Sequence, residues 1–491
     1  MDREIFFIAI DQGSSGTMST LFDRNLRCLD QIDLPVQSST PNYGWVEQDP
    51  WELVESVRAG VQALVRRNPQ CLENLEGIGL ANQGESFLLW DRGTGQPVTQ
   101  VVSWQDSRSE EFCAQLKKEG RNRWFHQKTG LHLSAEWPAL KVRQMRRTDS
   151  KLDERCRRGD IVFGQLDAWF LYVFTGGRRM ASDHGTACRT GFYNLGRQGW
   201  DEDLLRFFWG DDLILPDLMD NVERVEDLDL GIGKKLPWIA GGLDQAVTLI
   251  GQNCTRPGEV KVTYGTCCAC WMNTGTETIL DDNLTTSVAY QIHGKPTYAL
   301  AAEGGASGNV ITWLLENFST GWKLEALEEI ARQWDDQKEL VFVPAFQGLS
   351  APHWQEAKGI LFGITSGTRP EHLLRAGLDA VACTVRDILD CMPKFQRLVL
   401  DGGMTANGYL VQRQADVLGH PVERAKEREG TLMGIAKLCA ESLGIESEMD
   451  SAQKLERILP EPGGMEIYRR WKQAVETVIA YYQPDAQQSG E

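Results

Sequence analysis

The chain opens with Ile5-Phe6-Phe7-Ile8-Ala9-Ile10-Asp11-Gln12-Gly13-Ser14-Ser15-Gly16-Thr17, an apolar run that ends in an aspartate and a turn of glycine and serine. The segment from Met18 to Phe22 predicts a second strand directly after this turn. Such a turn can present backbone N–H groups to phosphate oxygens. Asp11 can hold Mg²⁺, which prefers oxygen ligands. An ordinary β-hairpin with a solvated tip explains this segment equally well when it is considered alone.

Length and charge narrow the possible functions. A chain of 491 residues is too long for one core, so we expect two domains or slightly more. The formal net charge of −18 argues against a nucleic-acid partner, because a phosphate backbone binds a basic surface. Met1-Asp2-Arg3-Glu4 lacks the basic segment of a signal peptide. No apolar run approaches about 18 residues, so we expect no membrane span and a cytoplasmic protein.

The twelve cysteines lie mostly inside apolar segments, which favours reduced thiols in the cytosol. Cys267-Cys268-Ala269-Cys270 contains a C-x-x-C pattern, but it lies in a strand-like stretch. No second pair follows at zinc spacing, so small buried side chains are the better interpretation.

A strand followed by a glycine-containing turn recurs later in the chain. Pro237 to Gln245 is an apolar run that ends at Asp244, and Glu259 to Thr266 is a strand that ends in Gly265-Thr266. Leu398 to Met404 contains Asp401-Gly402-Gly403. These units predict a weak internal repeat of a whole domain, with two halves that meet tightly at a cleft. The patterns also predict four helices. One begins at Asp49-Pro50, and the others span Leu373 to Cys391, Tyr409 to Leu418, and Met465 to Tyr482.

The glycine-rich turns indicate a nucleotide held between two domains, although the common nucleotide motifs are missing. The sequence contains no P-loop, no dinucleotide-binding G-x-G-x-x-G after a strand and no H-R-D or D-F-G element of protein kinases. Carboxylates combined with phosphate loops suit phosphoryl transfer. Asp11 would lie near the metal and phosphate, and Asp244 could accept the proton of an attacking hydroxyl. For Asp244 alone, a turn-forming role after Gly241-Gly242 remains the stronger alternative.

Further segments stand in a characteristic order along the chain. They are Asp11 to Ser15, Gly44 to Pro50, Ala81 to Gln83, Trp104 to Asp106, Thr129 to Leu131, Asp244-Gln245, Tyr264 to Thr266, Val343 to Phe346, Gly359 to Ile364, and Asp401 to Gly403. In this order they resemble the FGGY family of carbohydrate kinases, and within it most closely the glycerol kinases. The resemblance runs from about Ile5 to Leu443.

The resemblance implies an α/β fold of two ribonuclease H-like (actin-like ATPase) domains with an interdomain cleft. An N-terminal substrate-binding domain would span residues 1–250, a C-terminal nucleotide-binding domain 251–450, and a C-terminal helix and tail 451–491. The implied activity is phosphorylation of a hydroxyl of a small polyol or sugar, with ATP and Mg²⁺ as cofactors. The resemblance leaves a homodimer and a homotetramer open.

The resemblance also assigns roles to residues. Asp244 would be the general base, and Asp11 and Asp244 would lie at the metal. The residues implied in nucleotide binding are Gly13, Ser14, Ser15, Gly16, Gly265, Thr266, Gly308, Gly403 and Asn407. Those implied in substrate binding are Gly84, Glu85, Glu136, Trp137, Asp244 and Gln245.

Departures from the glycerol-kinase pattern bear on the substrate. Gly84 stands where an arginine is usual. We therefore expect the substrate site to lack the hydrogen-bond donors of a guanidinium and to have extra volume at this position. Glu136-Trp137 stands where an aromatic pair headed by tyrosine is usual. An ionised carboxylate only accepts hydrogen bonds, so it suits a substrate with more hydroxyl donors. We expect a polyol or ketose of four or five carbons, and a glycerol kinase with locally replaced contacts is the competing interpretation.

Two further departures concern the phosphate loops. Met18 replaces an arginine near the first loop, which removes a charge, and Cys267 replaces a glycine in the second, which adds a side chain where backbone should approach closely. They motivate an alternative function, a catalytically weak regulatory or sugar-binding protein on the same fold. A filament-forming actin-like protein is disfavoured, because it would leave the segments around Asn82 and Trp104 unexplained.

Overall fold

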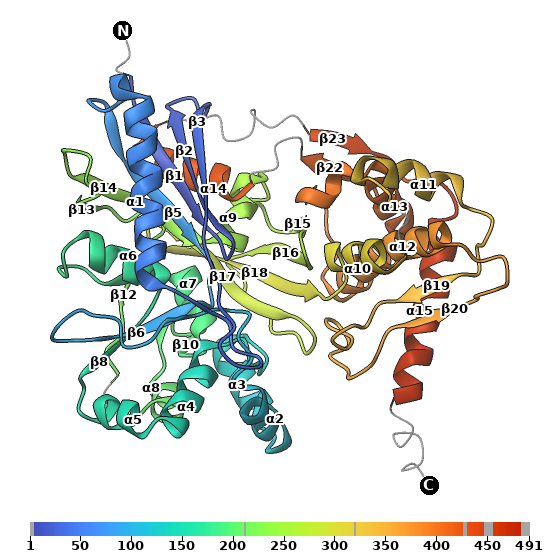
Figure 1. Ribbon diagram of the computed structural model, residues 1–491, viewed down its shortest axis with the longest axis horizontal. Coiled ribbons are helices and arrows are strands. Elements are labelled where there is room, and N and C mark those ends of the chain that lie inside the picture. The colour runs from blue at the N-terminus through green and yellow to red at the C-terminus, as the bar shows by residue number, and fades with distance from the viewer. Residues whose placement is uncertain (1–3, 211–212, 319–320, 426–429, 446–454, 483–491) are drawn as a thin grey trace.

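The computed structural model describes residues 4–210, 213–318, 321–425, 430–445 and 455–482. Two large sheets form the centres of two lobes, which lie side by side in Figure 1. The first lobe is blue to green in that view, and helices coloured yellow to red cover the sheet of the second lobe.

The first lobe contains a six-stranded sheet in the order β13-β14-β5-β1-β2-β3. Its strands are β1 (Phe6–Gln12), β2 (Gly16–Asp23), β3 (Cys28–Pro35), β5 (Leu75–Asn82), β13 (Val225–Leu228) and β14 (Leu236–Leu243). β1, β2 and β3 form an antiparallel meander, while β5 runs parallel to both β1 and β14. The opening segment of the chain is therefore a hairpin at the centre of a sheet, as its pattern predicts.

The second lobe repeats this arrangement in a seven-stranded sheet ordered β17-β18-β16-β15-β21-β22-β23. Its strands are β15 (Glu259–Tyr264), β16 (Cys268–Gly275), β17 (Thr285–Ile292), β18 (Lys295–Gly304), β21 (Arg397–Asp401), β22 (Val422–Ala425) and β23 (Leu455–Ile458). β15 and β16 form an antiparallel hairpin, and β21 runs parallel to β15. The predicted domain repeat is thus visible in the topology, since β1, β2 and β5 correspond to β15, β16 and β21.

Helices cover the sheets and fill the space between them. They are α1 (Pro50–Arg67), α2 (Glu110–Lys118), α3 (Asn122–Thr129), α4 (Pro138–Thr148), α5 (Ser150–Arg157), α6 (Leu166–Phe174), α7 (His184–Ala187), α8 (Glu202–Phe208), α9 (Asp244–Gly251), α10 (Gly308–Phe318), α11 (Leu327–Gln333), α12 (Pro370–Cys391), α13 (Gly408–Leu418), α14 (Gly430–Ser442) and α15 (Gly464–Tyr482). No helix within the described residues combines the length and the apolar character needed to cross a membrane.

Smaller sheets complete the structure. Their strands are β4 (Glu47–Gln48), β6 (Phe87–Asp91), β7 (Val101–Val102), β8 (Ile161–Gln165), β9 (Ala181–Asp183), β10 (Tyr193–Asn194), β11 (Gly199–Trp200), β12 (Asp217–Met219), β19 (Val341–Val343) and β20 (Ile360–Phe362). The four-stranded sheet β4-β7-β6-β8 and the helices α2 to α5 and α8 lie below the main sheet of the first lobe in Figure 1.

The helix predicted after Asp49 is α1, and its start shows why the local sequence folds this way. The Asp49 carboxylate accepts hydrogen bonds from the backbone N–H groups of Trp51 (2.7 Å) and Glu52 (3.0 Å), which caps the helix. One apolar face of this helix is fully buried, and its residues are Leu53, Val57, Val61 and Leu64.

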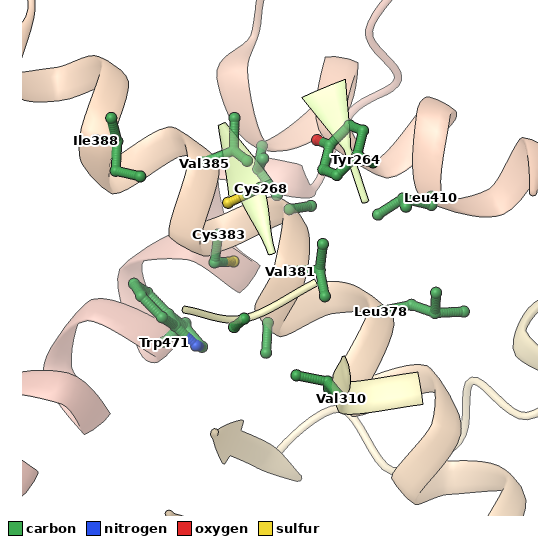
Figure 2. Packing of buried hydrophobic residues seen from close by; sticks show 14 of the residues in the cluster. Tyr264, Cys268, Val310, Leu378, Val381, Cys383, Val385, Ile388, Leu410 and Trp471 are labelled. Atoms are coloured by element: carbon green, nitrogen blue, oxygen red, sulfur yellow. The ribbon is translucent and has the colours of Figure 1, made fainter. Parts of the chain in front are cut away.

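The predicted C-terminal helix is α15, and it is part of the second lobe's core. Trp471 belongs to one apolar cluster with residues of α10, α12 and β16, part of which is shown in Figure 2. Cys268 and Cys383 lie among aliphatic side chains in the same cluster (Figure 2). The prediction of small buried side chains is confirmed for Cys268 and Cys270 and is wrong for Cys267, which is exposed. Of the predicted tail, residues 451–454 and 483–491 lie outside the described residues.

Between the lobes, α9 contacts strands of both large sheets, and α14 packs on α9 and on β1, β5 and β14 with the two helix backbones close together. A Cβ atom added to Gly251 of α9 would lie 1.9 Å from the carbonyl oxygen of Gly430, and one added to Gly434 would lie 2.1 Å from that of Val247. Only glycine permits so close a crossing. Because α9 follows directly from β14, this contact fixes the strand end at which Asp244 lies.

Candidate active site

The predicted carboxylates of the first lobe gather at one edge of its sheet. β1, β5 and β14 are parallel neighbours, and Asp11 pairs in register with Ala81, which in turn pairs with Gly242. Glu85 follows the end of β5, and Asp244 follows the end of β14. In open α/β sheets, ligands bind at the carboxyl ends of the strands, so this edge is the expected place for a site.

Asp244 is the first residue of α9, and its environment makes it a candidate base. Its Oδ1 atom accepts a hydrogen bond from the backbone N–H of Gln245 at 2.5 Å. Burial raises the pKa of Asp244 to about 7, and the negative charge of Glu85 contributes to the increase. A carboxyl group that titrates near neutral pH is a far better proton acceptor than an ordinary aspartate.

Glu85 is held by an arginine that sequence reasoning did not identify. Arg189 lies in a 3₁₀ turn after α7, and its Nε atom donates to Glu85 Oε1 at 2.5 Å. Its Nη1 atom donates to Ser287 Oγ at 3.2 Å. The guanidinium also stacks over Trp137, with 4.7 Å between its Cζ atom and the ring centroid. Burial opposes this charge, but Glu85 and other nearby carboxylates raise the pKa of Arg189 above its ordinary value.

This arrangement corrects the expectation that the site lacks a guanidinium and has extra room at position 84. Arg189 supplies a guanidinium from a different segment of the chain. Gly84 is buried, and its carbonyl oxygen accepts a hydrogen bond from the Gln165 side chain. A Cβ atom added to Gly84 would lie 2.1 Å from Leu243 Cδ1. Leu243 therefore fills the space that the missing side chain was expected to open.

Gln245 and Lys261 form a polar link between the lobes beside Asp244. Lys261 lies on β15 and is buried, and its Nζ atom donates to Gln245 Oε1 at 2.7 Å and to Thr263 Oγ1 at 3.0 Å. Burial lowers the pKa of Lys261, while the carboxylates of Asp401 and Asp244 oppose that decrease. The lysine thus places a cation of the second lobe next to the predicted base of the first.

A cavity of about 710 Å³ lies where the two lobes face each other, within the usual range for small-molecule sites. It is lined by side chains of both lobes, among them Trp104, Glu136, Trp137, Arg189, Cys267, Trp271 and Glu303. The cavity therefore brings Glu136 and Trp137, which the sequence predicts at the substrate, together with the turn that follows β15. Glu303 of β18 is an acidic residue of this cavity that sequence reasoning missed.

The two predicted phosphate loops are the tips of the two central hairpins. In the first, the N–H of Gly13 donates to the carbonyl of Gly16 at 2.9 Å, and Gln48 Nε2 holds the carbonyl of Ser14 at 2.8 Å. Ser15 is exposed at this tip. Met18 stands directly opposite Asp11 across the hairpin, so a thioether occupies the place next to the carboxylate.

The second hairpin tip is tied to the start of α10. The N–H of Gly265 donates to the carbonyl of Cys267 at 3.0 Å, and the N–H of Gly308 donates to the carbonyl of Gly265 at 3.0 Å. Gly265, Thr266 and Cys267 are exposed, so their backbone groups and side chains are accessible to a ligand. Gly308 is thus brought together with this loop, as expected for residues that share one ligand.

In the second lobe Gly403 begins the 3₁₀ turn Gly403–Ala406, and Asn407 follows as the N-cap of α13. A Cβ atom added to Gly403 would meet nothing within 4 Å, so the space beside it is open. Asn407 Oδ1 accepts a hydrogen bond from the N–H of Leu410 at 3.1 Å and caps the helix. Its carbonyl group therefore has a structural role, which leaves the side-chain N–H₂ as the group that can reach a ligand.

Comparison with known proteins identifies the family. The family model for the N-terminal domain of FGGY carbohydrate kinases matches residues 6–251, and that for the C-terminal domain matches residues 260–443. The chain belongs to the FGGY family of carbohydrate kinases. It is therefore a phosphotransferase with an alcohol group as acceptor.

Relatives of this carbohydrate kinase agree over nearly its whole length. It is 34% identical to a glycerol kinase of Coxiella burnetii (strain RSA 493 / Nine Mile phase I) over 96% of this chain and 98% of the relative. It is 32% identical to a glycerol kinase of Xanthomonas campestris pv. campestris (strain 8004) over 97% of this chain and 99% of the relative. No comparison supports the alternative of a regulatory protein without strong catalytic activity.

Solved structures confirm the fold of two α/β domains of the actin-like ATPase type. The structure of Plasmodium falciparum glycerol kinase with ADP matches with a TM-score of 0.89 and 25% identity, covering 96% of this chain and 98% of that chain. Xylulose kinase from Lactobacillus acidophilus also gives a TM-score of 0.89, at 18% identity, covering 98% of this chain and 99% of that chain.

Among the residues that line the kinase's cavity, Arg189 and Glu303 were missed for different reasons. Arg189 stands in a polar segment, Thr186 to Thr190, that carries no motif of its own. Glu303 had a usable signal, because it is the single charge in the run of small and apolar residues from Ala299 to Ala306. A lone carboxylate in such a strand is costly to bury unless it serves a purpose.

Proposed function

We propose that this kinase transfers the terminal phosphoryl group of ATP, bound with Mg²⁺, to a hydroxyl of a small polyol or sugar. The acceptor is glycerol-like or a polyol or ketose of four or five carbons, and Asp244 is the general base. The observation that carries this proposal is the position of Asp244, at a strand end beside Glu85 and Lys261, where burial raises its pKa to about 7.

The residues around Asp244 suit the positioning of an acceptor hydroxyl. Asp244 would accept the hydroxyl proton as the oxygen attacks phosphorus, and the side chain of Gln245, steadied by Lys261, would hold a neighbouring hydroxyl. Glu85, oriented by Arg189, would accept hydrogen bonds from further hydroxyls. Fixing the acceptor in this way accounts for much of the rate in phosphoryl transfer.

The nucleotide would lie across the two hairpin tips. Gly13, Ser14, Ser15 and Gly16 would border the phosphates from the first lobe, and Gly265 and Thr266 from the second. Gly308, Gly403 and Asn407 would contact the adenosine. Backbone N–H groups in such turns bind anionic oxygens without needing a charged side chain, which fits a loop in which Met18 stands next to Asp11.

Mg²⁺ fits the carboxylates at this edge of the first sheet. No group of three or more candidate metal-ligating side chains occurs among the residues that the structure describes. Mg²⁺ bound through substrate phosphates needs only one or two protein carboxylates, and Asp11 and Asp244 can supply them. The ion would neutralise charge on the phosphates.

The reaction would take place in the cytoplasm. All twelve cysteines are free thiols, and most are buried. Free thiols in this number fit a reducing compartment.

A panel of acceptors tests the proposal. Purified protein with ATP and Mg²⁺ would be assayed for ADP release with glycerol, erythritol, threitol, ribitol, ribulose and xylulose. We expect at least one acceptor to give turnover, and Asp244→Asn to abolish it while nucleotide binding remains. Asp227→Asn is a matched control, because this aspartate is exposed and is not among the residues that line the cavity. Failure of every acceptor, with ATP binding equal in all variants, would contradict the proposal.

A further inference from the structure

Glu136 and Glu303 face the same cavity from opposite lobes. Glu136 lies just before α4 in the first lobe, and Glu303 lies near the end of β18 in the second. Both side chains are partly buried. Within the described part of the chain, no hydrogen bond or ion pair to a protein group reaches either carboxylate, so each one keeps its acceptor capacity for a ligand.

The cations near these carboxylates are already engaged elsewhere. Arg189 donates to Glu85 and Ser287. Lys141 is buried, and its Nζ atom donates to the carbonyl oxygens of Ser103 (2.7 Å) and Trp104 (3.1 Å). Burial and the negative charge of Glu85 raise the pKa values of Glu136 and Glu303. Ionising these two carboxyl groups therefore costs free energy when no ligand is bound. Hydrogen-bond donors from a ligand would relieve that cost.

The cavity adjoins the reacting centre, because Arg189, which lines the cavity, donates to Glu85, while Asp244 and Glu85 are not among the lining residues. The negative charge of Glu85 raises the pKa values of Asp244, Glu136 and Glu303, so Glu85 lies near the candidate base and near both carboxylates of the cavity. Opposite Glu303, β16 carries only the small side chain of Ala269. The aromatic walls Trp104, Trp137 and Trp271 leave a volume of about 710 Å³, at the upper part of the range for small-molecule sites.

Resting on the proposed function, we infer that Glu136 and Glu303 form a distal subsite that determines which acceptor is used. The subsite selects a substrate whose far end carries several hydrogen-bond donors, as hydroxyl groups or as a protonated amine. Because one carboxylate belongs to each lobe, a bridging substrate also helps to hold the lobes together around it.

Isosteric variants test the subsite. Glu303→Gln and Glu136→Gln remove the charge but keep the shape, and Glu325→Gln is a matched control at an exposed position of the second lobe. The acceptors are glycerol, ribitol and 1-amino-1-deoxyribitol. We expect the ratio of kcat/KM for ribitol to kcat/KM for glycerol to fall about tenfold in each cleft variant, as for one lost hydrogen bond to a charged group. The KM for ATP and the control variant should be unchanged.

The amine separates the two kinds of donor. A larger loss for the aminopolyol than for ribitol would identify an ammonium group as the preferred donor, and equal losses would identify hydroxyl groups; both results support the subsite. An unchanged ratio in both variants would overturn it. A preference of the unmodified protein for glycerol over every longer acceptor would also overturn it.

A direct measurement of acceptor binding tests the subsite independently of the kinase reaction. Trp104, Trp137 and Trp271 line the cavity, so their fluorescence reports acceptor binding without ATP. Weaker ribitol binding in Glu303→Gln, combined with no ADP release from any acceptor, would refute the kinase reaction but retain the subsite. ADP release with unchanged ribitol binding would retain the kinase reaction and refute the subsite.

Discussion

Each lobe has a strand that leads to an aspartate next to a pair of glycines, and of these two residues Asp401 is buried and Asp244 is half-buried. In the first lobe Asp244 follows β14 after Gly241-Gly242, and in the second Asp401 ends β21 before Gly402-Gly403. Burial raises the pKa of both carboxyl groups. The difference lies in their partners. Gln252 Nε2 donates to Asp401 Oδ2 at 2.8 Å, whereas among the described side chains none hydrogen-bonds the Asp244 carboxylate.

The helix α9 connects the two aspartates. It begins at Asp244, and Gln252, which binds Asp401, follows its last residue. Asp401 therefore anchors one end of the helix whose other end carries the candidate base. Similar strand ends therefore serve different roles, since Oδ2 of Asp401 is bound by a side chain of the protein and the carboxylate of Asp244 accepts from no described side chain.

The largest expected effect is on catalysis. Asp244→Asn removes the proton acceptor, so kcat should fall about 10²-fold or more, with little change in nucleotide binding. Asp401→Asn is the comparison variant at the end of β21, and its loss of kcat should be much smaller. Steady-state kinetics with the best acceptor measures both. Equal losses of kcat in the two variants would show that the two aspartates do not differ in their catalytic importance.

The pH dependence of kcat/KM also distinguishes Asp244 from Asp401. A general base works only when it is deprotonated, so kcat/KM should rise with pH until the pKa of Asp244, at about 7, is passed. Below that point the rate should fall about tenfold per pH unit. Asp401→Asn should keep this profile. A flat profile between about pH 5.5 and about pH 8.5 would argue against a perturbed Asp244 as the base.

Stability should change in opposite directions at the two positions. The folded-state pKa of Asp244 is raised, so the protein loses stability as pH rises through about 7, and Asp244→Asn should raise the free energy of unfolding at pH 8. Asp401→Ala removes the partner of Gln252 and should lower that free energy by about 1–3 kcal/mol. Urea unfolding at pH 8 measures both changes. Below the unfolded-state pKa of aspartate the gain from Asp244→Asn should vanish, and its persistence there would point to another cause.

The smallest expected effect concerns the nucleotide loop of the second lobe. In Gly308→Ala the new Cβ atom would lie 2.7 Å from the carbonyl oxygen of Gly265, so the loop must shift. We expect the KM for ATP to rise about tenfold, which corresponds to about 1.4 kcal/mol, with the acceptor KM unchanged. Gly196→Ala is the control, since its nearest neighbour would be 3.6 Å away. A change in the acceptor KM alone would contradict the prediction that Gly308 lies at the nucleotide.

Local sequence patterns were enough to predict the strands and helices that carry the predicted phosphate loops. The hairpin at Asp11, the cap at Asp49 and the helices of the second lobe depend on residues within a few positions of one another, and the structure confirms them. The order of the motifs predicted the family, which the family models confirm. The expectation of extra volume at Gly84 was wrong, because the residue that fills the space, Leu243, is far away in the sequence.

The sequence by itself determined the fold class, the phosphate-loop hairpins and the identity of Asp244 as the candidate base. Only the tertiary structure decided how that base is tuned and what surrounds it. The pKa of Asp244 depends on burial and on the charges of Glu85, Lys261 and Glu303, which come from three different strands or strand ends. Arg189 and Glu303 enter the cavity from segments without a motif. Burial and Coulomb interactions depend on distance in space, and folding sets those distances between residues that are remote in the chain.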